Sequence, residues 1–258
     1  MLEPIFTRYL YEKREAMHAL LIALLKKQMR AALFWTYELY FSGFELELWD
    51  WIACIYEEFY KTWNPRYERH LVAKYDEWSD TLNPDLIGSV VMTLSHRSCS
   101  LVLYFERMGI EIAESETTTP IPEKYVFHFN FLQDYATVCP TKLADVSKFA
   151  IPKQATRYLM DHANLDSLSD DAIREAYFGP DWLYYCRQTP LWRTRIQEHG
   201  GTIDTQNKRV VFPSDDSLEQ FYGKYGLEPD EQSLETHEKH GFLEYQKIPS
   251  LDEFIQTL

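Results

Sequence analysis

Residues 45–63, ELELWDWIACIYEEFYKTW, place apolar side chains around most of the circumference of a helix. Two neighbouring stripes of residues spaced three or four apart are apolar, which is the period of an α-helix. The first stripe is Leu46, Trp49, Ala53, Tyr56, Tyr60 and Trp63, and the second is Leu48, Ile52, Ile55 and Phe59. A narrow, mostly acidic band is left for water. We therefore expect this helix to be covered, either by its own fold or by a partner protein.

The whole chain is rich in aromatic residues, with 18 Tyr, 15 Phe and 7 Trp against only 9 Gly in 258 residues. Large rings bury much area in protein cores, and they are also enriched at protein interfaces. The surplus is therefore consistent with a thick core or with an interaction surface. For the second interpretation the candidate partner surface is Trp49, Tyr56, Tyr60 and Trp63.

The first 112 residues are predicted to contain five helices. Two of them, over about 12–27 and 30–42, precede the aromatic helix, and Gly43 follows the second as a left-handed helix cap would. The Asn64-Pro65 and Asn83-Pro84 pairs each place a capping side chain before a proline suited to a first helical turn. The sequence therefore predicts one further helix after each pair.

The last helix of this series is predicted to end at Gly109. Short turns between the helices favour antiparallel neighbours. The predicted fold class is mainly α: an antiparallel helical bundle or a short helical-repeat stack, with a smaller α+β C-terminal part that contains one β-hairpin.

Changes in composition suggest how the chain is organised. Residues 1–112 are the predicted aromatic bundle, and 113–124, AESETTTPIPEK, read as a linker or loop because they lack periodicity. Residues 125–226 are predicted to be a mixed helical segment with a hairpin near 202–212. Residues 227–258 form an acidic C-terminal arm.

The segment from Pro180 onward has the clearest local signals in the second half. A helix is predicted up to His199, interrupted or restarted near Pro190. The sequence GGTIDTQNKRVVF then predicts a hairpin that pairs Thr202–Asp204 with Arg209–Phe212. A final helix follows, and its two candidate N-caps are Ser214 and Asp216.

The net charge of −14 restricts the partners of the chain. An acidic surface repels phosphate backbones and anionic lipids, so neither general nucleic-acid binding nor membrane binding is expected. Two short basic clusters are local exceptions, although such clusters are usually solvated helix faces. Together they form a candidate basic patch of Lys26, Lys27, Arg30, Arg187, Arg193 and Arg195.

Familiar catalytic motifs are missing from the sequence. It contains no GxxxxGK[ST] or GxGxxG phosphate loop, no GxSxG elbow and no kinase signature set. His237 and His240 are three residues apart in a Glu-rich stretch, without the HExxH order of a zinc helix. We predict no catalytic residue, no cofactor and no metal site.

Two weaker groups contain residue types that carry chemistry. His96 and Cys99 are three apart on one predicted helix, where a histidine bonded to a neighbouring carbonyl is the simpler interpretation. Cys139 precedes a proline with His128 nearby in the sequence, but a Cys/His nucleophilic pair needs spatial contact and an activated thiol.

The cysteines and the short apolar runs predict an intracellular, soluble protein. Cys54, Cys99, Cys139 and Cys186 include no CxxC pair, and no disulfide framework is expected at this chain length. Cys54 and Cys99 are predicted to be small buried hydrophobic residues. The longest apolar run, 19–25, is far shorter than the ~18–20 residues that cross a bilayer.

Two stretches of the chain carry a family resemblance. RAALFWTYELYFSGFELELWDWIACIYEEFY (30–60) resembles the N-terminal part of uncharacterised proteins from nucleocytoplasmic large DNA viruses, the giant viruses. TPLWRTRIQEHGGTIDTQNKRVVFPSDDSLEQFYGKYGLEPDEQ (189–232) is similar to the C-terminal portion of the same proteins. The resemblance implies no activity and no functional residue. It implies an infected host cell as the setting, either the cytoplasmic viral factory or the virion.

Three hypotheses of function follow. The leading one is a non-enzymatic interaction or scaffold protein that binds viral or host proteins or a second copy of itself. The alternative is an accessory subunit of a viral replication, transcription or translation complex that touches nucleic acid through the basic patch. The third is an enzyme of unrecognised type that uses Cys139, His128 or the pair His237 and His240.

Overall fold

The computed structural model describes residues 5–8, 11–100, 102 and 182–225. This part of the chain is mainly helical and contains one two-stranded antiparallel hairpin, which confirms the predicted fold class. The elements are α1 (Lys13–Leu25), α2 (Met29–Tyr40), α3 (Glu45–Ile55), the π-helix η1 (Tyr56–Tyr60), α4 (Tyr67–Thr81), α5 (Pro84–Ser95), α10 (Trp182–Cys186), α11 (Pro190–Glu198), β1 (Thr202–Asp204), β2 (Arg209–Val211) and α12 (Asp215–Tyr225).

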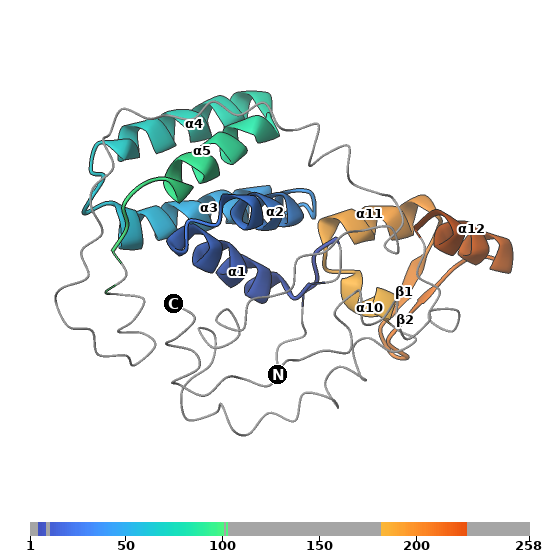
Figure 1. The fold of residues 1–258 in the computed structure, drawn as a ribbon. Coiled ribbons are helices and arrows are strands. Elements are labelled where there is room, and N and C mark those ends of the chain that lie inside the picture. The colour runs from blue at the N-terminus through green and yellow to red at the C-terminus, as the bar shows by residue number, and fades with distance from the viewer. Residues whose placement is uncertain (1–4, 9–10, 101, 103–181, 226–258) are drawn as a thin grey trace, which may run out of the picture.

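Two groups of elements are visible in Figure 1. Helices α1 to α5 pack together, and we call residues 11–100 the bundle. Helices α10 to α12 and the hairpin lie together at one end of it, and we call residues 182–225 the C-terminal module. None of the described helices is long and apolar enough to span a membrane.

The centre of the bundle is built on α1 and α2. The ALLIALL run of α1 is buried at every position from Ala19 to Leu25, as its composition predicts. The helix ends in a tight turn in which the Gln28 N–H donates to the carbonyl of Ala23 and Lys27 adopts a left-handed φ of 57°. This turn reverses the chain, so α2 packs back along α1 and also against α5.

The end of α2 joins the bundle to the C-terminal module. Gly43 has a φ of +92°, as its predicted role as a left-handed cap requires. A Cβ atom at this position would lie 2.5 Å from Cβ of Pro190, so the two backbones approach closely. The Leu191 N–H donates to the carbonyl of Ser42 at 3.3 Å, and the Thr189 hydroxyl donates to the carbonyl of Phe6.

The aromatic helix differs from its prediction in one respect. The predicted helix 45–63 is α-helical over α3 and then continues as the π-helix η1. A π-turn contains one residue more than an α-turn and so shifts the register of the following side chains. Tyr56 and Tyr60 are nevertheless buried beside Ile55 and Phe59, on the same face as Trp49 and Ile52.

Aromatic rings hold α3 and η1 against α4. The ring of Trp49 lies 5.6 Å from that of Tyr75 and 5.7 Å from that of Trp78, and the ring of Tyr56 lies 5.9 Å from that of Tyr67. Because early residues of one segment meet late residues of the other, the two segments run antiparallel. Much of the aromatic surplus therefore lies in the core of the bundle.

The two Asn-Pro pairs have different roles. Asn83 is the N-cap of α5, where its side chain accepts a hydrogen bond from the Asp85 N–H at 3.0 Å, as predicted. Asn64 does not cap α4, which begins at Tyr67 without a side-chain cap. Its buried amide instead donates to the carbonyls of Tyr60 at 2.9 Å and Ser98 at 2.8 Å.

Helix α5 ends earlier than predicted, at Ser95 rather than near Gly109. The chain then returns to the bundle: Arg97 donates to the side-chain oxygen of Asn64 at 3.3 Å, and the Ser100 N–H donates to the carbonyl of Phe59 at 2.7 Å. These bonds replace the next helical turn. The predicted linker 113–124 and the predicted arm lie outside the described residues.

The C-terminal module matches its local signals closely. The helix predicted up to His199 is split at Pro190 into α10 and α11. The hairpin pairs Thr202 with Val211 and Asp204 with Arg209, one residue shorter than predicted. Of the two candidate N-caps, Ser214 is the one whose side chain accepts a bond, from the Ser217 N–H at 3.2 Å.

A small aromatic core holds the module together. The ring of the fully buried Trp192 lies 5.2 Å from that of Trp182 and 6.0 Å from that of Tyr225. Phe221, from α12, lies 6.4 Å from Trp192. Four aromatic rings from three helices thus form the module's share of a hydrophobic core that continues into the bundle.

Replacement of Gly43 by alanine should destabilise the protein by about 2–3 kcal/mol. The left-handed φ penalises any Cβ, and the new methyl group meets Pro190. Urea unfolding followed by circular dichroism measures the change. Gly223→Ala is the matched control, because this helical glycine has open space around it. The control should gain about 0.5–1 kcal/mol of stability. A Gly43→Ala protein as stable as the control would contradict the close approach of Gly43 to Pro190.

The same Asn→Asp substitution should have opposite consequences at the two Asn-Pro pairs. Asn64→Asp removes two donors to buried carbonyls and should cost about 2–3 kcal/mol. Asn83→Asp keeps the oxygen that caps α5 and should change stability by less than about 0.5 kcal/mol. Urea midpoints of the two variants test the contrast, and equal losses would refute the assigned roles.

Candidate functional site

The predicted partner surface is largely inside the bundle. Trp49, Tyr56 and Tyr60 are at most 2% exposed, and only Trp63 reaches the surface, at 37%. Within the chain itself, α4 covers Trp49 and Tyr56, and Tyr60 continues the same buried face. These three side chains therefore belong to the core rather than to a partner surface.

The six residues of the predicted basic patch fall in different places. Lys26, Lys27 and Arg30 lie at the connection between α1 and α2, where burial lowers the pKa of Lys26. Arg195 is used within the module, because its guanidinium stacks 4.6 Å from the ring of Trp192 and 4.4 Å from that of Tyr225. The two that remain, Arg187 and Arg193, line one pocket.

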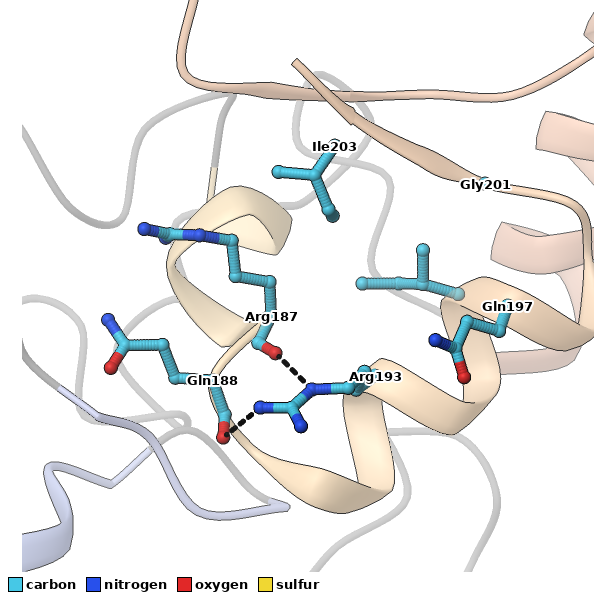
Figure 2. Close-up of a pocket in the computed structure, with 7 residues that line it drawn as sticks. Arg187, Gln188, Arg193, Gln197, Gly201 and Ile203 are labelled. Carbon is cyan, nitrogen blue, oxygen red and sulfur yellow. Dashed lines mark hydrogen bonds between the residues drawn. The ribbon is translucent and has the colours of Figure 1, made fainter. Parts of the chain in front are cut away.

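We call this site the arginine pocket. It has a volume of about 360 Å³ and lies between the α10–α11 connection and the start of the hairpin. Figure 2 shows Arg187 and Gln188 on one side of the hollow, Gln197 on the other and Ile203 above it. Its full lining is Arg187, Gln188, Arg193, Ile196, Gln197, Gly201 and Ile203.

Backbone carbonyls hold both guanidinium groups in place. Arg193 lies one turn into α11 and reaches back to the connection, donating to the carbonyls of Arg187 at 3.2 Å and Gln188 at 3.4 Å (Figure 2). Arg187 donates to the carbonyl of Tyr184 at 2.7 Å and stacks on its ring. A guanidinium has five donors, so Arg193 keeps donors for a ligand beyond those that bond to the two carbonyls.

Arg193 has no carboxylate partner among the described residues, since its hydrogen bonds go to carbonyls. Arg209, in β2, is by contrast paired with Asp204 at 3.4 Å. That carboxylate also organises the hairpin loop, and its hydrogen bonds from Asn207 lower the pKa of Asp204. Arg193 is therefore a positive charge that two carbonyls hold in place and that no described carboxylate neutralises.

Apolar groups complete the pocket. Ile196 is buried, while Ile203 is 40% exposed. Gly201 is required beside them, because a Cβ at this position would lie 2.6 Å from the side chain of Ile196. The hollow thus combines guanidinium groups, two side-chain amides and an aliphatic surface.

The charge of the chain is unevenly distributed. The C-terminal module contains six basic and five acidic residues, for a net charge of +1, while the bundle carries −3. Residues 103–181 and 226–258 each carry −6. The arginine pocket is therefore set in the one described region whose net charge favours an anionic ligand.

No other chemistry-bearing group of the sequence forms a reactive site in the described part of the chain. His96 bonds to the carbonyl of Met92 at 2.9 Å, as the simpler interpretation predicted. Burial raises the pKa values of Cys99 and Cys186, which leaves these thiols protonated. Among the described residues no three His, Cys, Asp or Glu side chains are grouped to hold a metal ion.

Four residues named in the sequence hypotheses, Cys139, His128, His237 and His240, lie outside the described residues. Cys54 is exposed, contrary to its predicted burial, because it lies on the outer face of α3 beside Ala53. The third hypothesis, an enzyme that uses Cys139, His128 or the pair His237 and His240, stays a prediction.

Sequence reasoning found the two arginines of the pocket but missed Gln188, Gln197, Ile196 and Ile203. The only signal for them was their position on either side of Pro190 and at the first strand of the hairpin. Comparison with known proteins adds nothing to this geometry, since no family model, curated protein or solved structure matches the chain.

Thiol labelling tests the burial of the cysteines. At pH 8 iodoacetamide should modify Cys54 at least about a hundredfold faster than Cys99 and Cys186, because only the exposed thiol meets the reagent without local unfolding. Mass spectrometry of peptides gives the rate at each site. In urea the three rates should converge; comparable rates in the native protein would contradict the structure.

Proposed function

We propose that this chain is a non-enzymatic interaction protein whose C-terminal module binds an acidic segment of a partner protein in the arginine pocket. The observation that carries the proposal is Arg193, a guanidinium held by two backbone carbonyls and paired with no described carboxylate. Such a group forms strong, charge-assisted hydrogen bonds with a carboxylate.

The remaining lining suits a peptide. The amides of Gln188 and Gln197 both donate and accept, as the main chain of a peptide requires. Ile203, 40% exposed, offers an aliphatic surface for a neighbouring side chain. A carboxylate, a main chain and an apolar side chain are the three groups that an acidic peptide brings together.

Nucleic acid fits the same lining less well. Non-specific single-strand binding combines a long basic groove with exposed aromatic stacking platforms. The pocket has no aromatic lining residue, and its two arginines meet in one hollow. Long-range repulsion from a net charge of −14 also opposes a polyanion.

Local nucleic-acid contact, as in an accessory subunit of a viral complex, is the second candidate function. It is favoured by the net charge of +1 on the module, which includes the exposed Lys208 and Arg209 of the hairpin. The viral setting, in the host cytoplasm or the virion, is likewise a proposal that rests on the resemblance of residues 30–60 and 189–232. The partner protein is then viral, cellular or a second copy of this chain.

A peptide with one carboxylate tests the proposed function. The probe is fluorescein-labelled Thr-Val-Thr-Glu-Thr-Val-Thr, and its control has Gln in place of Glu. Arg193→Ala should weaken binding of the Glu peptide by about tenfold or more, the loss expected for one charged hydrogen-bonded contact. The Gln peptide should bind the unaltered protein about tenfold or more weakly than the Glu peptide does. Fluorescence anisotropy measures both.

Arg69→Ala is the matched control, because it removes the same charge from an exposed position on α4 and should change binding less than twofold. Equal binding of the Glu and Gln peptides, or no effect of Arg193→Ala, would overturn the proposal. An oligothymidylate that binds in a salt-sensitive, Arg193-dependent manner while the peptide does not would favour the second candidate.

A further inference from the structure

The first strand of the hairpin contributes directly to the arginine pocket. Gly201 and Ile203, immediately before and within β1, are both lining residues. Among the described residues β1 pairs with β2 alone, in a sheet of two strands. One edge of β1 therefore carries main-chain groups that no described strand satisfies.

Such an edge can accept another strand. Backbone N–H and C=O groups in a strand point alternately to its two sides, so an edge strand offers a ladder of donors and acceptors to an extended peptide. Several peptide-binding domains use this mode, in which the main chain provides affinity and pockets for alternate side chains provide specificity.

The arginine pocket can provide the specificity, because it lies where side chains of an added strand would reach it. In an extended peptide, side chains two residues apart point to the same face and are separated by about 6.5–7 Å. An acidic side chain that reaches Arg193 therefore directs the side chains two residues away to the same face, where Ile203 is exposed.

From these observations we infer that the partner segment binds as an added strand on the edge of β1 that no described strand pairs. It places an acidic side chain at Arg193 and an aliphatic side chain, two residues away, on Ile203. This inference rests on the proposed function and specifies its recognition mode. The occupant is an extended segment of the pattern acid–x–aliphatic or its reverse.

Backbone methylation of the same probe tests the recognition mode. One peptide carries N-methyl groups on the residues at positions 3 and 5, and the other carries them on positions 4 and 6. The main-chain groups of these two sets point to opposite edges of the peptide strand. One methylated peptide should therefore lose at least tenfold in affinity, and the other should bind within about threefold of the unmethylated probe.

Equal affinities of the two methylated peptides, whether both are retained or both lost, would overturn strand addition. Absence of binding by the unmethylated probe would instead reject the proposed function, so the two failures are distinguishable. Hydrogen exchange of the full chain gives an independent measurement: the tolerated peptide should slow exchange in residues 201–204, and the blocked peptide at the same concentration should not.

Discussion

A close backbone contact at the end of α2 governs the arrangement of the two parts of the molecule. The buried Ser42 accepts a hydrogen bond from the Arg8 N–H at 2.7 Å, and its carbonyl accepts one from Leu191. Gly43 then lets the chain pass against Pro190. Because Pro190 begins α11 and Arg193 follows one turn later, this contact also fixes where the pocket stands relative to the bundle.

Local signals sufficed for most of the fold. The spacing of apolar residues located every described helix of the bundle, and Gly43, Asn83 and Ser214 marked helix boundaries through their own backbone or side-chain chemistry. The errors arose where distant residues decide the outcome. Asn64 has the same sequence context as Asn83, yet its amide is taken by the carbonyl of Ser98, 34 residues away.

The candidate site was less predictable than the fold for the same reason. A regular α-helical period places Tyr56 and Tyr60 on the stripe of Trp49, and the sequence does not show that α4, rather than a partner, covers this stripe. Arg193 was recognisable as basic, but its value as a binding group depends on which acceptors surround it. Among the described residues two carbonyls and no carboxylate do so, and only the path of the chain around Pro190 determines this.

Electrostatics constrains how such a pocket can work in so acidic a chain. At separations beyond the Debye length of ~8 Å in physiological salt, the charges of the chain are largely screened. An acidic segment that has entered the pocket is close to Arg193, whereas the net charge of −14 opposes its approach at long range. Moderate salt therefore relieves the repulsion before it weakens the contact. Selectivity for an acidic partner then depends on short-range hydrogen bonds rather than on the net charge of the chain.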